Sequence, residues 1–164
     1  MDQQAFNTFY RQTYTLLYGY VFRLCGNSPV SEDIVQESYL RFMEKPPVQE
    51  QFAAQKSYLY TIATRKMADY FRVRKKQEQT GIAMKNNPGD TTQPVYNEAT
   101  GQALHDALDL LSNHDKTLLW LAYVEGYGHK EIGQVLNLKP NSIRVLLFRA
   151  KQRLRELLAE KPKK

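Results

Sequence analysis

The sequence predicts an all-α protein, with two small helical domains joined by a flexible linker. Apolar residues recur at helical intervals through residues 1–76 and again through 98–161. No run alternates apolar and polar residues in the way that a half-buried strand does. Between the halves, residues 77–97 are rich in Gly, Pro, Asn, Gln and Thr, a composition typical of a tether. We therefore predict a first domain over 1–76, a linker over 77–97 and a second domain over 98–161.

The first helix of the chain is predicted from an apolar stripe whose members step by four, seven, four and three positions. These intervals keep their side chains on one face of a helix, which we expect to face the core. Gly26 and Asn27 then end the helix. The stripe consists of Phe6, Tyr10, Leu17, Val21 and Leu24.

A second helix is predicted over residues 29–45, with Ser28 as its N-cap and Pro29 at its first position. Pro46 and Pro47 stop it, because proline disfavours helix in the residue before it and has no N–H to donate. Val35, Tyr39 and Phe42 point inward. The opposite side presents Asp33, Gln36, Glu37 and Leu40.

After a loop to about Lys56, a third helix is predicted, with two distinct faces. Its apolar face consists of Leu59, Ile62, Ala63 and Tyr70. Its other face carries a hydroxyl and cations, in the order Thr61, Arg65, Ala68, Arg72 and Lys75. Aromatic residues lie just before and along it, at Phe52, Tyr58 and Tyr60. Cations and aromatic rings together suit single-stranded nucleic acid, although a solvated outer face with the aromatics in the core would give the same pattern.

The second half predicts a helix-turn-helix. Two helices come first, over 103–111 and 115–126, and Ser112 or Asn113 caps the second of them. A short helix over 129–137 and a last helix that begins at Pro140 follow. Gly133 lies where the last two helices approach closely, so a side chain larger than a methyl group would be crowded. Asn137 lies in the turn, where a left-handed backbone is needed and Asn tolerates it.

The last helix combines a buried stripe with an exposed face suited to DNA. The stripe consists of Ile143, Leu147, Ala150, Leu154 and Leu157. The exposed face carries arginines beside apolar residues, which fits bonds to base edges and contact with thymine methyl groups. Its candidate residues are Asn141, Ser142, Arg144, Val145, Phe148 and Arg149. Lys151, Arg153 and Arg155 lie further along and suit phosphates. Alternatively, Phe148 packs on a neighbouring helix.

Composition narrows the class of protein. A formal charge of +6 favours an acidic partner. No apolar run approaches the roughly 20 residues of a membrane span, and the N-terminus lacks a signal-peptide pattern. The single cysteine, Cys25, excludes an intrachain disulfide and favours a reducing compartment. His105, His114 and His129 lack metal-ligand spacing, so we expect no metal, no cofactor and no enzyme activity. The missing membrane span and signal peptide, together with the single cysteine, predict a location in the cytoplasm.

Three segments resemble a known family. "SEDIVQESYLRFME" resembles the helix by which bacterial sigma factors of the short extracytoplasmic-function (ECF) type bind core RNA polymerase. "SYLYTIATRKMADYFRVRKK" resembles their promoter-melting and minus-ten segment, and "LWLAYVEGYGHKEIGQVLNLKPNSIRVLLFRAKQRLRE" resembles their minus-thirty-five reader. The three segments in this order, split by a linker, cover nearly the whole chain.

The resemblance implies a function and roles for particular residues. The chain would bring core RNA polymerase to promoters and open the DNA there. The implied partner is core RNA polymerase, through its β′ and β subunits, and Asp33, Gln36, Glu37 and Leu40 would contact β′. The loop over 46–56 would capture a flipped base. The non-template strand at minus ten would lie along Phe52, Tyr58, Thr61, Arg65, Arg72 and Lys75. The minus-thirty-five duplex would meet Asn141, Ser142, Arg144, Val145, Phe148, Arg149 and Lys151. An anti-sigma factor is an implied partner.

Departures from the family pattern leave the preferred promoter sequence open. Tyr58 stands where the family usually has Trp, Arg65 where it usually has Asn, and Val145 and Leu146 where Ser and Arg are common. Two other functions share some of these features. One is a stand-alone helix-turn-helix regulator, although no extra dimerisation helix is evident. The other is a sigma-like decoy of an anti-sigma factor, which would have no use for the basic stripes.

Overall fold

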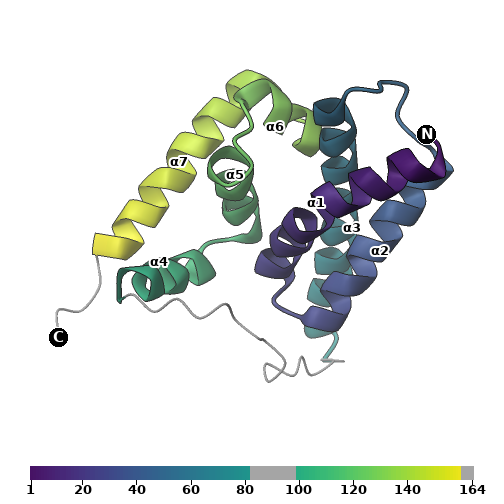
Figure 1. Cartoon of the computed structure of the whole chain (residues 1–164). Helices are drawn as coiled ribbons and strands as arrows, with labels where there is room; N and C mark the ends of the chain where they lie inside the picture. The colour runs from purple at the N-terminus through teal and green to yellow at the C-terminus, as the bar shows by residue number, and fades with distance from the viewer. Residues whose placement is uncertain (82–98, 160–164) are drawn as a thin grey trace. The chain divides into compact units, whose positions relative to one another are not determined.

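The structure, a computed structural model, describes residues 1–81 and 99–159, which form seven α-helices and no strand. The prediction of an all-α fold is confirmed. The chain divides into two compact units, Met1–Thr91 and Thr92–Lys164, each described here by itself. The first contains α1 (Gln3–Cys25), α2 (Ser28–Glu44) and α3 (Phe52–Gln79); the second contains α4 (Ala99–Leu110), α5 (Asn113–Tyr123), α6 (His129–Leu136) and α7 (Pro140–Ala159) (Figure 1). Most of the predicted linker, residues 82–98, lies outside the described residues.

α1 begins where the Asp2 carboxylate accepts a hydrogen bond from the Ala5 N–H at 2.7 Å, and ends at Gly26, whose φ of 66° is left-handed. Leu17, Val21 and Leu24 are buried as expected. Tyr10, however, is 37% exposed. The packing face is centred closer to Phe9, whose ring stacks on that of Phe42 with centroids 4.9 Å apart, so Phe6 and Tyr10 lie at the edge of the core.

α2 is capped one residue earlier than predicted. The Asn27 side-chain oxygen, and not that of Ser28, accepts from the Val30 N–H at 3.1 Å. Ser28 is the first helical residue, and its hydroxyl is hydrogen-bonded to the Tyr18 hydroxyl at 2.9 Å. The inward positions Val35, Tyr39 and Phe42 are all buried, and the helix ends at Glu44, ahead of the two prolines.

α3 begins four residues earlier than the sequence indicated, at Phe52 instead of Lys56. The N-cap, Gln51, makes no side-chain capping bond, so no start signal was visible there. The first turn contains two alanines, which favour helix without a cap. The connection from α2 is therefore short, residues 45–51. α3 also runs through Gln79, beyond the predicted domain end at 76. Its buried side packs against both α1 and α2.

In the second unit, α5, α6 and α7 enclose a core that includes Leu118, Leu121, Ile132 and Ile143. Ser112 is the cap of α5, one of the two residues expected. Asn137 has φ 57° and ψ 48°, the left-handed conformation predicted for the turn. A Cβ on Gly133 would lie 2.4 Å from the Leu138 carbonyl oxygen. The turn thus excludes even a methyl group, a tighter limit than expected, because the close neighbour is backbone of the turn itself.

Candidate nucleic-acid interface

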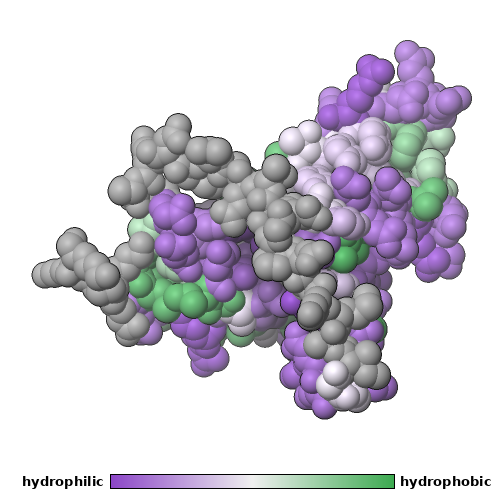
Figure 2. Space-filling view, turned by 90° about the horizontal axis from the view of Figure 1, so that it is seen from below, coloured by the Kyte–Doolittle hydropathy of each residue, from purple (hydrophilic) through white to green (hydrophobic). Residues whose placement is uncertain are grey.

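Hydrophilic side chains cover much of the surface of both units in the space-filling view, and the apolar residues form separate patches (Figure 2). One exposed strip runs along α2. Its members lie on the side of α2 away from the buried Val35 and Phe42, and all four are exposed: Asp33, Gln36, Glu37 and Leu40. Leu40 is 54% exposed. Glu37 is also paired with Lys66 of α3 at 3.4 Å. We call these four residues the α2 ridge.

The cationic face of α3 is exposed, but part of its charge is balanced nearby. Arg65 and Lys75 are exposed. Arg72, whose side chain is 74% exposed, is paired with Asp69 at 2.7 Å. The Thr61 hydroxyl is half-buried and donates to the Ser57 carbonyl oxygen at 2.9 Å. On this face, contact of Arg72 with a strand would therefore compete with an acid of the same helix.

The aromatic residues at the start of α3 have three different environments. Phe52 is 46% exposed and meets Phe9 edge-on at 5.9 Å. Tyr58 is half-buried, with its ring 5.8 Å from that of Phe42 and its hydroxyl donating to the Lys45 carbonyl oxygen at 2.5 Å. Tyr60 is fully buried and stacks on Tyr20 at 5.1 Å. Of the two expectations for these aromatics, Tyr60 follows the second, an aromatic in the core, because α3 packs against two helices and buries a wider face.

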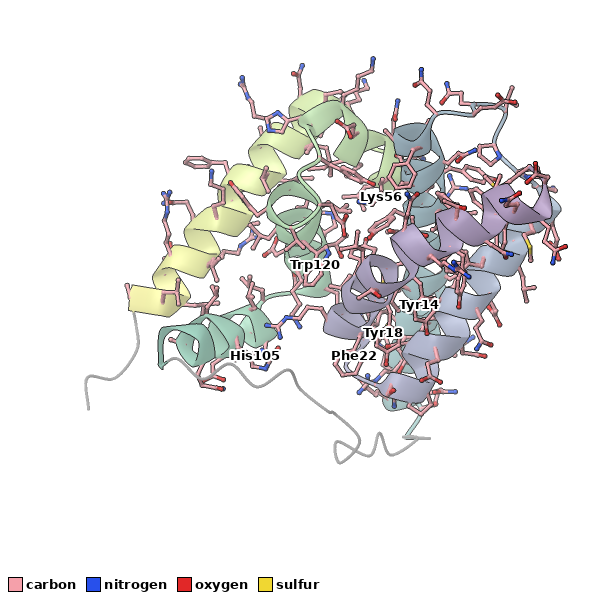
Figure 3. The ribbon with its side chains drawn as sticks, viewed as in Figure 1. Tyr14, Tyr18, Phe22, Lys56, His105 and Trp120 are labelled. Carbon is pink, nitrogen blue, oxygen red and sulfur yellow. The ribbon has the colours of Figure 1, made fainter. Side chains whose placement is uncertain are left out.

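A row of aromatic residues on α1 was not singled out from the sequence. Tyr14, Tyr18 and Phe22 follow one another along the helix (Figure 3), with ring centroids 6.1 and 5.8 Å apart, and Tyr10 continues the row at 5.2 Å from Tyr14. Their spacing of four residues places them on one side of the helix. Tyr39 of α2 contacts the row, with its ring 4.7 Å from that of Tyr10.

The first half of α7 presents the predicted exposed face. Asn141, Ser142, Arg144 and Arg149 are exposed, and Val145 and Phe148 are 44% and 63% exposed. Phe148 therefore does not pack into the core of its own unit. Ile143, Leu147 and Ala150 are buried on the opposite side, whereas Leu154 and Leu157 are only half-buried. The first half of α7 therefore presents arginines and apolar side chains together on one solvent-exposed face.

The second half of α7 is used differently. The Arg153 guanidinium donates to both carboxylate oxygens of Asp115 at 2.9 and 2.8 Å. The Asp115 side chain is only 5% exposed, against 54% for Arg153. Lys151 is half-buried, with its ammonium 5.6 Å from the centre of the Tyr123 ring. Arg153, which the sequence suggested for phosphates, is bound by a buried carboxylate on α5 in this structure.

Asp115 is the residue that the sequence analysis missed here. Its signal was the Ser112-x-x-Asp115 pattern, in which the serine caps α5 and accepts from the Asp115 N–H at 3.2 Å. An acid at this position is favoured by the helix dipole. The pattern indicates the start of α5, but it does not indicate that the acid faces α7.

In the part of the chain that the structure describes, the remaining polar groups do not form a metal site, and the one thiol is not reactive. No group of three or more His, Cys, Asp or Glu residues within 1–81 and 99–159 could hold a metal ion. Burial raises the pKa of the Cys25 thiol to about 12, so the thiol stays protonated at neutral pH. None of the helices in the part of the chain that the structure describes is long and apolar enough to cross a membrane.

Comparison with known proteins agrees with this geometry. The family model for sigma-70 region 2 matches residues 9–77, and that for sigma-70 region 4 matches residues 101–154. The chain is 29% identical to the ECF RNA polymerase sigma factor SigE of Mycolicibacterium smegmatis over 92% of its own length, and spans 60% of that relative. It is 26% identical to the RNA polymerase sigma factor CarQ of Myxococcus xanthus, covering 96% of this chain and 91% of CarQ.

A solved structure shares the fold. A chain from the co-crystal structure of the sigma factor RpoE with the anti-sigma factor NepR, from Bartonella quintana, superposes with a TM-score of 0.78 at 20% identity. The match covers 96% of this chain and 98% of the solved one. At this identity, the likeness describes the fold.

The two helical units and their matched regions define a transcription initiation factor of the sigma class. Both matched regions belong to the sigma-70 family, and relatives such as SigE are sigma factors of the ECF type. The chain belongs to the ECF type of the sigma-70 family, whose function is to direct RNA polymerase to promoters.

Proposed function

We propose that the α2 ridge binds core RNA polymerase, that α3 guides the non-template strand at the minus-ten element, and that the first half of α7 reads the minus-thirty-five duplex. The chain then acts without catalytic chemistry of its own, in the cytoplasm where polymerase and promoter DNA are found. The observation that carries the proposal is the exposed face of α7, where the side chains of Val145 and Phe148 are exposed to solvent beside Arg144 and Arg149. Contact with thymine methyl groups and base edges accounts for this combination.

Promoter opening is an exchange of stacking partners. Unstacking a base step costs about a few kcal/mol. Capture of a base on an aromatic side chain returns about 1–3 kcal/mol, so one or two captured bases offset the cost at an A·T-rich site. Phe52, exposed beside the connection over 45–51, and the cations of α3 have the chemistry for this capture.

We propose that the two domains, joined by a linker, bind promoter DNA together only when both are held by polymerase. We propose that the two domains contain α1–α3 and α4–α7, so that the first domain runs at least to Gln79, beyond the expected boundary at 76. Each domain binds DNA weakly, and polymerase holds the two at the promoter spacing. Binding of the first domain then raises the effective concentration of the second at its element. The same arrangement leaves both domains accessible to an anti-sigma factor, which we propose as a third partner because the structural neighbour RpoE is solved with one.

The α2 ridge offers a direct test of polymerase binding. Asp33 is an exposed acid on a surface helix, so Asp33→Arg should leave the fold intact and abolish co-elution with core polymerase on a sizing column. Asp106→Arg, the same charge change at an exposed site of the second unit, is the matched control and should co-elute normally. If Asp33→Arg still binds polymerase, the ridge is not the binding surface.

Promoter activity is tested by run-off transcription with core polymerase and this chain on a pool of random promoters. A sigma factor selects a subset of the pool and starts transcripts at defined positions. A stand-alone regulator would bind DNA but would not co-elute with polymerase. A decoy of an anti-sigma factor would give no promoter-dependent transcript.

A further inference from the structure

Tyr58 of α3 is hydrogen-bonded to the first residue of the connection between α2 and α3, residues 45–51. Lys45 is the C-cap of α2, and two prolines follow it before Val48, which is 98% exposed. A carbonyl in the last turn of a helix has no partner within the helix and needs a donor from elsewhere. The Tyr58 hydroxyl, 13 positions along the chain, supplies one to the Lys45 carbonyl oxygen at 2.5 Å.

This hydrogen bond fixes the peptide plane from which the connection departs. Pro46 follows Lys45 directly, and proline restricts the backbone of the residue before it. Lys45 has φ −132° and ψ 77°, so its carbonyl points out of the helical ladder towards α3. With Pro46 and Pro47 next in the chain, the orientation of this one carbonyl sets the path of the exposed residues that follow.

The ring of Tyr58 also packs against a buried aromatic residue. It lies 5.8 Å from the ring of Phe42, which is 1% exposed and stacks on the buried Phe9. Phe52, at the other end of the connection, meets the same Phe9 edge-on. Both ends of residues 45–51 are thus anchored on one aromatic cluster: Phe9, Phe42, Phe52 and Tyr58.

We infer that Tyr58 is a positioning residue. It holds residues 45–51 in the conformation that receives a base of the non-template strand, and its ring is not a surface on which that base stacks. The inference rests on the proposed function, because it assigns Tyr58 a role in strand capture. Stacking would require the ring to leave Phe42, or the hydroxyl to leave Lys45, whereas Phe52 is available without either change.

The first experiment measures the connection itself and needs no polymerase. A fluorophore is attached at Val48→Cys, a fully exposed position, with a maleimide reagent at neutral pH. Cys25 is 6% exposed and its thiol is protonated, so it should not be labelled. Tyr58→Phe, which removes only the hydroxyl, should lower the anisotropy of the label. Tyr70→Phe, the same change at a half-buried tyrosine of α3, should not.

The second experiment measures strand opening with unlabelled chain and core polymerase. Loss of one hydrogen bond predicts a slowing of open-complex formation by about fivefold for Tyr58→Phe, read from the permanganate reactivity of minus-ten thymines. Tyr70→Phe should match the unchanged chain. Pro47→Gly, which loosens the connection with Tyr58 intact, should slow opening as Tyr58→Phe does. Thermal melting of each variant checks that the first unit is folded.

The outcomes separate this inference from the proposed function. Higher label mobility together with slower opening supports positioning. Unchanged mobility in Tyr58→Phe, or higher mobility with normal opening, overturns it. Normal opening in both Tyr58→Phe and Pro47→Gly would mean that the ring alone matters, as in stacking. If the unchanged chain itself gives no promoter opening with core polymerase, it is the proposed function that fails, and the mobility result still stands by itself.

Discussion

Two basic helices, α3 and α7, carry the proposed DNA contacts, and they differ in how their cations are neutralised. On α3, Arg72 and Arg74 are each paired with an acid of the same helix, with Asp69 at 2.7 Å and Glu78 at 3.4 Å. On α7, Arg144 and Arg149 have no acidic partner among the described residues, whereas Arg153 is bound by Asp115 of α5.

The difference matches two kinds of nucleic-acid target. A flexible single strand can be held by stacking and by moderate charge, and it must be released as transcription proceeds. A duplex element is read by bonds and apolar contacts to base edges, which need bare side chains on a helix that is held rigidly. In α7 the arginines are divided along the helix: Arg144 and Arg149 in the first half are open to DNA, whereas Arg153 in the second half is bound to Asp115 of its own unit.

The division within α7 predicts the largest effect on stability. Arg153→Met leaves the Asp115 carboxylate, 5% exposed, without its cation. Losing one partner of a buried pair is strongly destabilising, but Arg153 is more than half exposed and water screens it, so we expect a loss of about 2 kcal/mol in the free energy of unfolding. Trp120, the only tryptophan, lies in α5 of the second unit, so its fluorescence in urea reports this unit's unfolding.

Arg149→Met is the matched control for that measurement, with the same side-chain change one helical turn earlier. It should alter the unfolding free energy by less than about 0.5 kcal/mol, as expected for an exposed site without a buried partner. Equal losses in the two variants would show that α7 is not divided in the way proposed.

Arg149 should affect DNA reading instead. Arg149→Ala in the polymerase complex should reduce discrimination between minus-thirty-five sequences by about 1–3 kcal/mol, the range of one specific arginine–base contact. The measurement is the Kd for a set of duplexes with single base changes. A loss that is equal on all sequences would identify Arg149 as a phosphate contact. Lys151→Ala, at a half-buried cation over the Tyr123 ring, provides a comparison in which little sequence preference should change.

The pattern of apolar residues was sufficient to predict the all-α fold and the exposed residues of α2 and α7. Helical periodicity assigns each residue an angle around its helix, so Asp33 and Phe148 could be assigned to outer faces without knowledge of their neighbours. Gly133 and Asn137 were identifiable because their backbone requirements are local.

Contacts between helices were not predictable in the same way. Tyr60 is adjacent to Leu59, and both are buried because α3 packs against α1 and α2 at once; periodicity alone assigns one stripe to a helix. The Asp115–Arg153 pair joins residues 38 positions apart, and nothing in the local sequence of either residue indicates the other. The hydrogen bond of the Tyr58 hydroxyl was not predictable for the same reason, because its acceptor is the carbonyl of Lys45, the residue that follows α2.

The smallest expected effect concerns the paired cations of α3. Asp69→Asn releases Arg72 from its 2.7 Å partner and removes a negative charge from the proposed strand path. Because an exposed pair is worth about 0.2–1 kcal/mol, the polymerase complex should bind a single-stranded minus-ten oligonucleotide about twofold more tightly. The gain should shrink as salt is raised, since exposed charges are screened.

Glu78→Gln is the control, because it releases Arg74 of the neighbouring pair, which lies outside the proposed strand contacts. Binding that does not change in Asp69→Asn would mean that Arg72 lies off the strand's path. Binding that rises equally in both variants would point to a general effect of charge along α3. A gain confined to Asp69→Asn would show that Arg72 contacts the strand and that Asp69 weakens this contact, in contrast to Arg144 and Arg149 of α7, which pair with no acid within 1–81 and 99–159.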